Sequence, residues 1–352
     1  MRKLYIPILI ILILIAAGGG YWFYQKKSAP QSASVYSQTN SETQSGDTAD
    51  NTDPKNLLKN YGPMPELVGL EKTWFNSDPL TKEKLKGKTV LVNFWTYSSI
   101  NSIRTLPQVT KWYDTYKDQG LVVIGIHTPE FNFEKVPLNV ESAIKKYAIG
   151  YPVALDNNYK TWTAFKNQFW PAQYLINPDG NIVYTHFGEG KYDVTEKAIR
   201  TLLGLEGDFQ IAQPDAGQSA NTAQIYFGLT RLQNFGGAEK PNNGEQIFTF
   251  PAKLKANQFA LEGTWVFNQE AAVHTKGFGR IKLNFNAAKV FMVAQSDKPT
   301  TIKVYVDGQL VKGVVVSGSD LYQLYDSATG GQHTMEIEVP DNNFQAFTFT
   351  FG

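Results

Sequence analysis

The sequence predicts an α/β domain with a mixed β-sheet, followed by an all-β antiparallel sandwich. Two observations predict this order. From residue 57 to 206, short apolar runs alternate with segments of helical periodicity and end in a hairpin and a last helix. From residue 207 to 352, strand signals recur at roughly ten-residue intervals without a long helical period. A length of 352 residues fits two domains of about 100–200 residues each.

The composition excludes several kinds of site. The chain has no cysteine, so disulfides, thiolate nucleophiles, zinc–cysteine sites and iron–sulfur clusters cannot form. It has only four histidines, which makes a dedicated metal centre unexpected. Thirty-three basic residues stand against 32 acidic ones, and a net charge of +1 gives no whole-chain attraction for nucleic acid. We therefore expect no cofactor, no metal and no nucleic-acid partner.

Residues 1–27 predict a membrane anchor or uncleaved signal. Residues 4–24 carry no charge, and a helix of that length spans about 30 Å, the thickness of the hydrocarbon core. The very short tail before this span favours an N-terminus inside, which places the globular domains outside the cytoplasm at the plasma membrane. A cleaved signal peptide is the alternative, because Ala16-Ala17-Gly18 offers small residues for cleavage.

Residues 28–56 predict a disordered polar linker. Among the 27 residues from 28 to 54, 15 are Ser, Thr, Asn or Gln and none is basic. Such a segment cannot bury enough apolar surface to offset the entropy lost on ordering.

The elements of the first domain follow from buried runs and helical periods. Thr89–Thr96 is β-branched and aromatic, which predicts a buried strand. Ser99–Lys117 places apolar residues three and four apart and predicts a helix that Pro107 should kink. Pro178-Asp179-Gly180 predicts the hairpin turn, and Asp193 the N-cap of the last helix. The other predicted strands are 121–127, 151–155, 172–176 and 181–187, and the other helices are 140–147, 159–167 and 193–203.

The second domain is predicted to consist of short strands. Ile302, Val304 and Val306 alternate with polar residues, and Asp307-Gly308 predicts the hairpin turn that follows them. The nine predicted strands are 247–250, 259–267, 279–285, 289–294, 301–306, 311–316, 321–325, 334–339 and 345–351.

One segment of the first domain carries a resemblance. Asn93-Phe-Trp-Thr-Tyr-Ser-Ser-Ile-Asn-Ser-Ile-Arg-Thr-Leu-Pro107 resembles the active-site strand and helix of thioredoxin-like (redoxin) proteins of the TlpA and DipZ type, which read W-T-Y-S-C-I-N-C. Four further stretches follow in the family's order: His127–Phe131, Tyr151–Asp156, Trp170–Ile176 and His186–Gly190. The resemblance implies a thioredoxin fold, with Trp95 beside the site and a cis peptide bond between Trp170 and Pro171 facing it.

The chain departs from the family at the two redox positions, which are Ser99 and Ser102. Thiol–disulfide exchange needs a thiolate that attacks sulfur and a second sulfur that resolves the mixed disulfide. A hydroxyl stays protonated at neutral pH and cannot form a disulfide. Oxidoreductase chemistry at this site is therefore excluded for the sequence as it stands.

Other roles for the serines and their neighbours follow from chemistry and from the resemblance. Ser98 or Ser99 should cap the helix by accepting from free backbone N–H groups. A Ser99–His127 hydrolase pair is a weak alternative, because nothing reads G-x-S-x-G. Glu130 is either the acidic residue that many TlpA-like proteins place near the redox pair or a solvated loop carboxylate. Arg104 is expected at the surface.

The second domain is similar to the C-terminal part of DipZ-type proteins, a jelly-roll module like those that bind carbohydrate. The matching pieces are 225–231, 261–266, 321–325 and 346–352. Sugar binding uses exposed aromatic rings, for which Tyr226, Trp265, Tyr322 and Tyr325 are the candidates. Each of the four rings is alternatively a core residue.

These observations predict an anchored, extracytoplasmic binding or docking factor that is an oxidoreductase in ancestry only. Its partner would be an exported protein or peptide, since the proline loop of thioredoxins pairs with extended backbone. A glycan-binding envelope protein is one alternative. The other is an engineered form of an active oxidoreductase, because Cys-to-Ser substitution at both positions is also what an experimenter makes to abolish redox chemistry.

Overall fold

A computed structural model of the chain describes residues 57–70, 73–207, 220–340 and 343–352. The predicted anchor and the whole of the predicted linker lie outside these ranges. Among the helices that are described, none has the length and apolar character needed to cross a membrane.

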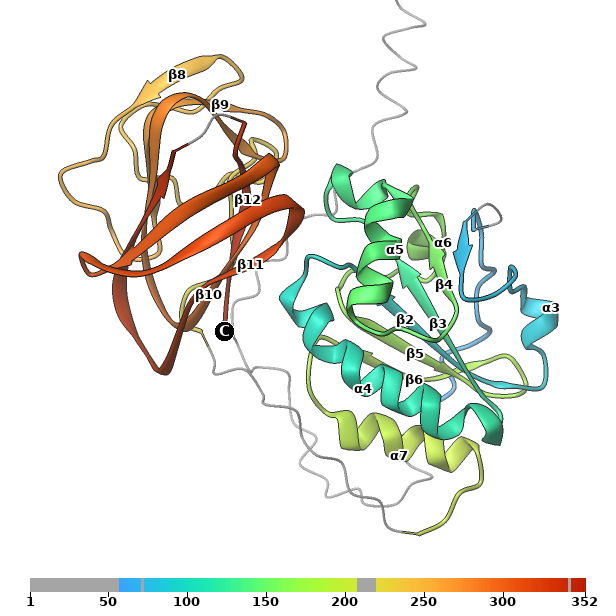
Figure 1. The fold of residues 1–352 in the computed structure, drawn as a ribbon. Helices are drawn as coiled ribbons and strands as arrows, with labels where there is room; N and C mark the ends of the chain where they lie inside the picture. Colours follow the sequence, from blue (N-terminus) through green and yellow to red (C-terminus); the bar gives the residue numbers. More distant parts are fainter. Residues whose placement is uncertain (1–56, 71–72, 208–219, 341–342) are drawn as a thin grey trace, which may run out of the picture. The chain divides into compact units, whose positions relative to one another are not determined.

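The first domain contains a six-stranded mixed sheet in the order β1-β4-β3-β2-β5-β6 (Figure 1). Its centre is the parallel trio β2, β3 and β4, while β1, β5 and β6 pair antiparallel with their neighbours. The strands are β1 (Trp74–Phe75), β2 (Thr89–Trp95), β3 (Leu121–His127), β4 (Val153–Leu155), β5 (Ala172–Ile176) and β6 (Ile182–Phe187). This arrangement confirms the predicted thioredoxin fold.

Helices cover both faces of this sheet because its central strands are buried on both sides. Helices α4, α5 and α7 supply core residues to one face, and α3 and α6 supply them to the other. The helices are α3 (Lys82–Leu85), α4 (Ile100–Tyr116), α5 (Pro137–Lys146), α6 (Lys160–Ala164) and α7 (Tyr192–Leu202), with short 3-10 turns η1 (Lys117–Gln119) and η2 (Asn132–Lys135).

Three helix predictions differ in detail from the structure. Helix α4 runs on through Pro107 as one element. Helix α5 begins at Pro137, three residues earlier than predicted, because proline suits the first helical turn, where no N–H bond is lost. Asp193 is not the N-cap of α7: Lys191 takes that place with φ 48°, and Asp193 lies in the first turn, where its charge favours the helix dipole.

All pairs of named strands described in the second domain are antiparallel, in the strand order β7-β12-β10-β9-β8, with β11 paired to β10. The strands are β7 (Ile225–Tyr226), β8 (Glu245–Phe248), β9 (Phe259–Phe267), β10 (Ala272–Val306), β11 (Gln309–Val339) and β12 (Gln345–Phe351). Three predicted strands merge into β10 and three into β11, because register shifts bend a continuous ladder instead of ending it. The jelly-roll connectivity stays a prediction.

The Asp307-Gly308 turn is confirmed, since Val306 pairs with Gln309 across it. Asp307 has φ 50° and Gly308 has φ 80°, both in the left-handed region that two-residue hairpin turns need. Replacing Gly308 with Ala should therefore lower the free energy of unfolding by about 1 kcal/mol, measured by thermal or denaturant unfolding. The control is Gly313→Ala in the same hairpin, where a new Cβ would meet a side-chain methyl at 3.4 Å, an ordinary contact. Equal losses in the two variants would contradict the turn argument.

Candidate functional site

The two serines lie at the start of helix α4, at the carboxyl end of β2. The Ser99 hydroxyl accepts from the backbone N–H of Ser102 at 3.4 Å, which confirms Ser99 as the helix N-cap. Ser102 is fully buried, and its hydroxyl accepts from the backbone N–H of Thr96 at 3.4 Å. Ser99 is partly exposed. We call four residues the serine site: Ser99, Ser102, Trp95 at the end of β2, and Pro171, which precedes β5 where that strand pairs with the end of β2.

His127 does not serve as a base for Ser99. It is fully buried between two rings, with its centroid 5.1 Å from that of Trp95 and 5.7 Å from that of Tyr97. Its Nε2 lies 3.5 Å from Thr96 Oγ1, and within the described residues no hydrogen bond joins it to Ser99. Burial lowers the pKa of His127 to about 3, so its ring is neutral and structural. The geometry therefore gives no support to a Ser–His hydrolase.

The peptide bond between Trp170 and Pro171 is cis, as the resemblance implied. The Trp170 indole N–H donates to the carbonyl of Thr128 at 3.0 Å, which fixes this loop to the end of β3. Beside it, Phe187 at the end of β6 is 45% exposed, and its ring lies 5.3 Å from that of Phe169. An apolar surface therefore accompanies the proline loop.

Glu134 belongs to the surroundings of the site and was missed in the sequence. It is fully buried, and its carboxylate accepts from the Ser98 hydroxyl at 2.6 Å and from the Ser98 N–H at 3.3 Å. It also accepts from the backbone N–H groups of Glu130 and Phe131. Burial raises the pKa of Glu134 to about 7, against the lowering effect of the hydrogen bonds from Ser98. The available signal was its position three residues after Phe131, where a glutamate can reach back to the start of a helical turn.

Glu130 is not a solvated loop carboxylate, because its side chain is 8% exposed. Its Oε1 forms an ion pair with the Arg231 guanidinium at 2.7 Å and accepts from the Tyr226 hydroxyl at 2.7 Å. Burial, with the nearby Glu130 charge, holds the pKa of Tyr226 well above its usual range, so this phenol remains a donor. The predicted sugar-binding ring of Tyr226 is thus engaged by the first domain.

Comparisons with known proteins match both domains. Residues 69–185 match the AhpC/TSA family, and residues 222–352 match a thioredoxin-like C-terminal domain. Protein DipZ of Mycobacterium tuberculosis is 38% identical over 306 residues, which are 84% of this chain and 44% of DipZ. The thiol-disulfide oxidoreductase YkuV of Bacillus subtilis is 32% identical over 147 residues, which are 42% of this chain and 97% of YkuV. The chain belongs to the thioredoxin-like redoxins of the DipZ type.

This DipZ-type redoxin spans less than half the length of the DipZ proteins that it matches. Among solved structures, a thioredoxin-like protein in its oxidised form is 31% identical over 41% of this chain and 97% of that chain, with a TM-score of 0.38.

The redoxin fold is retained around Ser99 and Ser102, so what separates this site from dithiol chemistry is the missing sulfur atoms. Within the described residues, no three His, Asp or Glu side chains are grouped so as to hold a metal ion.

Arg104 of the redoxin lies on α4 and is more buried than predicted, with 19% of its side chain exposed. It pairs with Glu189 at 3.4 Å, and its guanidinium carbon lies 5.7 Å from the centroid of the Phe291 ring. The sequence position, one turn into a helix, does not reveal either partner.

The predicted sugar-binding aromatics of the second domain differ in exposure. Trp265 is fully buried and donates to the carbonyl of Glu262, so it is a core residue and presents no ring face to solvent. Tyr325 packs against the buried Phe285, with ring centroids 5.8 Å apart. The Tyr322 hydroxyl donates to the carbonyl of Ser317 at 2.8 Å, and both tyrosines keep partial exposure. The structure does not bring the four rings together as one platform.

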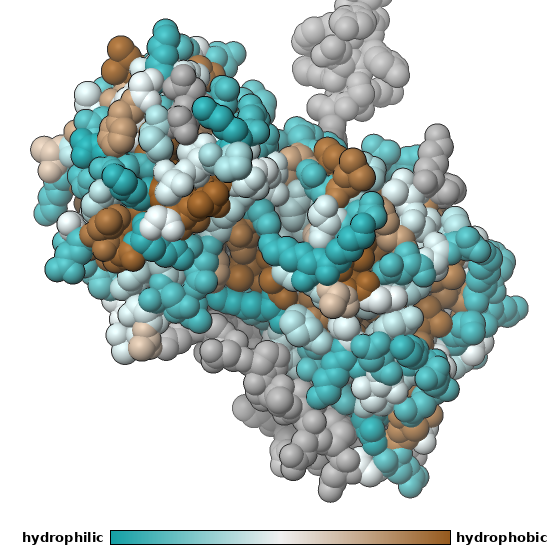
Figure 2. All heavy atoms as spheres, in the orientation of Figure 1, coloured by the Kyte–Doolittle hydropathy of each residue, from teal (hydrophilic) through white to brown (hydrophobic). Residues whose placement is uncertain are grey.

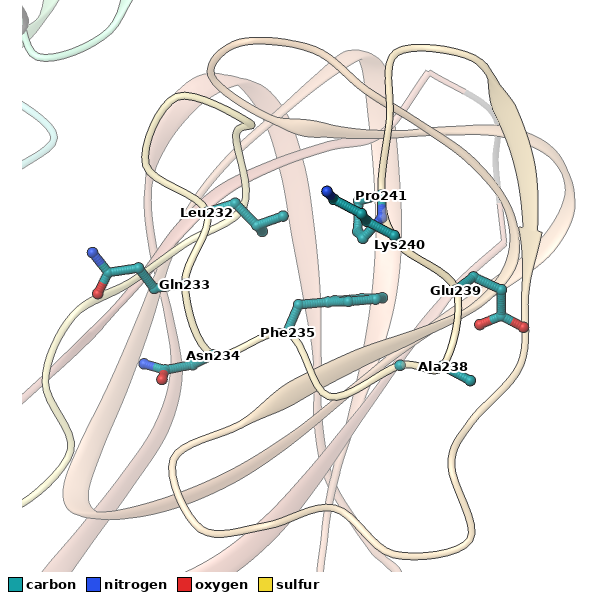
Figure 3. A pocket seen from close by; sticks show the side chains of 9 residues that line it. Leu232, Gln233, Asn234, Phe235, Ala238, Glu239, Lys240 and Pro241 are labelled. Carbon is teal, nitrogen blue, oxygen red and sulfur yellow. The ribbon is translucent and has the colours of Figure 1, made fainter.

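A shallow hollow of about 380 Å³ opens elsewhere on this domain (Figure 3). The ring of Phe235 lies at its centre, with Leu232, Lys240 and Pro241 around it. Phe235 also packs edge-on against the buried Phe248. On the face drawn in Figure 2, apolar residues are interspersed with hydrophilic ones, as is ordinary for a folded surface.

Proposed function

We propose that this chain is a redox-inactive, thioredoxin-like docking factor that holds an extended segment of an exported protein beside Pro171. The observation that carries the proposal is a retained redoxin site, with its cis-proline loop in place, in which both sulfur positions are hydroxyls. Pairing with extended backbone requires main-chain groups and apolar contacts but no sulfur. The proposal includes a membrane tether through residues 4–24, with the globular domains outside the cytoplasm.

The exposed ring of Phe187 supports this proposal. Phe187 is the last residue of β6 and directly follows the residue of β6 that pairs with Gln173. The N–H of Gly188, the residue after Phe187, donates to the carbonyl of Pro171 at 2.9 Å. A peptide alongside the proline loop would therefore lie against an aromatic side chain that is 45% exposed. Aromatic anchors of this kind contribute strongly to peptide affinity.

The test uses the purified chain and carboxymethylated insulin B chain, an extended peptide without reactive thiols. We expect saturable binding by calorimetry, and about a tenfold weaker affinity for Phe187→Ser, equal to ~1.4 kcal/mol. The matched control is Phe278→Ser, which removes a 53% exposed ring from the second domain. Absence of binding, or equal weakening by both substitutions, would argue against the proposal.

The same chain should not reduce insulin. Neither Ser99 nor Ser102 can attack a disulfide sulfur or resolve a mixed disulfide, so turnover with dithiothreitol should equal the uncatalysed background. The turbidity assay for precipitated insulin B chain measures this directly. Turnover above background would remove the premise that the site is redox-inactive.

A further inference from the structure

The loop between β3 and α5 contacts the second domain through a partly buried ion pair that lies among aromatic rings. The Glu130–Arg231 pair joins residues 101 positions apart, and the Tyr226 hydroxyl donates to the same carboxylate oxygen. The Arg231 guanidinium carbon lies 3.9 Å from the Tyr226 ring centroid and 5.0 Å from that of Phe131. We call Glu130, Phe131, Tyr226, Arg231 and Phe347 the joint.

The apolar part of the joint is a small core of its own. The rings of Phe131 and Phe347 meet edge to face with centroids 5.2 Å apart, and Phe133 lies 4.9 Å from Phe347. Ala271 and Val293 complete this buried cluster. A guanidinium that stacks on aromatic faces while pairing with a carboxylate is held in one orientation, which lysine could not match.

The same loop is tied to the serine site from its other side. The backbone N–H groups of Glu130 and Phe131 donate to the Glu134 carboxylate, which in turn accepts both the amide and the hydroxyl of Ser98. Ser98 directly precedes the partly exposed N-cap Ser99. One carboxylate thus links the joint to the turn that begins α4.

We propose that Arg231 is a positioning residue of the serine site: from the second domain it fixes and neutralises Glu130, and thereby sets the electrostatic environment of position 99. Without Arg231, the Glu130 carboxylate would stand buried and uncompensated near that turn. Without Glu130, the Arg231 cation would stand there instead. Removing Arg231 and removing Glu130 should therefore change the electrostatic potential at position 99 in opposite directions.

Three other segments of the chain place charged or titratable groups around the joint. Glu134 lies on η2, Glu270 precedes β10 and accepts from the Asn132 N–H, and the Tyr159 hydroxyl donates to the Pro129 carbonyl. Burial disfavours the charged form of Arg231, but the Glu130 carboxylate and, more weakly, the Glu270 carboxylate raise the pKa of its guanidinium. Arg231 is thus a cation that pairs directly with Glu130 and also interacts electrostatically with Glu270.

The experiment uses Ser99→Cys as a reporter, since the parent chain has no other thiol. The rate of iodoacetamide alkylation against pH gives the titration midpoint of Cys at position 99. A negative charge disfavours a thiolate, so adding Arg231→Met should raise the midpoint by about half a pH unit. Adding Glu130→Gln instead should lower the midpoint by about the same amount. Adding Arg231→Met and Glu130→Gln together should return the midpoint to that of the Ser99→Cys reporter alone.

Two controls separate positioning from simple loosening of the loop. Arg231→Lys keeps the charge and should keep most of the reporter's midpoint. Arg280→Met removes a cation that pairs with Glu262 and Glu336 within the second domain and should leave the midpoint unchanged. A shift in the same direction for Arg231→Met and Glu130→Gln, or no shift in either, would overturn the proposal. If Arg231→Met does not fold, the direction in which Glu130→Gln shifts the titration midpoint still tests the proposal: a lower midpoint supports it, and a raised or unchanged midpoint overturns it.

Discussion

Restoring cysteine at both positions, as Ser99→Cys with Ser102→Cys, should raise insulin reduction at least about a hundredfold above the parent chain. The physical reason is local. Position 99 is the N-cap of a helix of 17 residues, where free N–H groups and the helix dipole stabilise a thiolate. Position 102 lies one turn further on and its backbone N–H already faces the side-chain oxygen of residue 99. The turbidity assay for reduced insulin measures the outcome.

The single Ser99→Cys substitution is the control for this experiment. It supplies an attacking thiol without a resolving one, so it should form a stable mixed disulfide with glutathione and show no turnover. Full activity of the double variant would favour recent or deliberate loss of the sulfurs. A double variant that forms its disulfide poorly and does not turn over would contradict the prediction and place the divergence in the surrounding residues as well.

Glu134 should make the stability of the chain depend on pH. Its pKa rises from 4.5 to about 7 on folding, so the folded state holds the proton more tightly than the unfolded state. Its contribution to stability is therefore complete below pH 4.5 and is lost as pH rises through 7. Linkage over this range amounts to about 3 kcal/mol in the free energy of unfolding. Glu134→Gln should lose that dependence, and denaturant unfolding between pH 4.5 and 8 measures the difference between the two proteins.

The difference between variant and parent isolates Glu134 from other buried groups. Burial raises the pKa of Asp156 to about 6, which acts in the same direction. The lowered pKa of His127 acts the other way, since its unfolded form takes up a proton as pH falls below 6.5 and costs stability there. Both groups are present in both proteins and cancel. Glu141→Gln, on the exposed side of α5, should keep the parent's pH slope, and the same slope in Glu134→Gln would contradict the assignment.

Much of the first domain was predictable because its signals are local. The buried strand β2, the helix α4, the hairpin around Pro178-Asp179-Gly180 and the capping role of Ser99 each depend on residues within a few positions of one another. The second domain was predictable as antiparallel β, but not in the number of its strands. Bulges decide whether a ladder bends or ends, and these depend on pairing partners far along the chain.

The neighbours of the serine site were less predictable. Glu130 was expected either near the redox positions or in solvent; the solvated alternative is wrong, because its side chain is buried against Arg231 of the other domain. Trp265 was a candidate for an exposed ring and is instead fully buried. Burial and ion pairing are properties of residues that meet in space, and a single sequence gives no signal for pairs 101 positions apart.

The sequence by itself determined the chemistry that this protein lacks: without sulfur at positions 99 and 102 no thiol–disulfide exchange is possible, whatever the fold. It also predicted a mixed sheet covered by helices, from local periodicity and turn residues, and its resemblance to the redoxins implied the thioredoxin fold. Only the tertiary structure decided what holds the serine site, since the Glu134 and Glu130 carboxylates acquire their roles from burial and from partners that the fold brings to them.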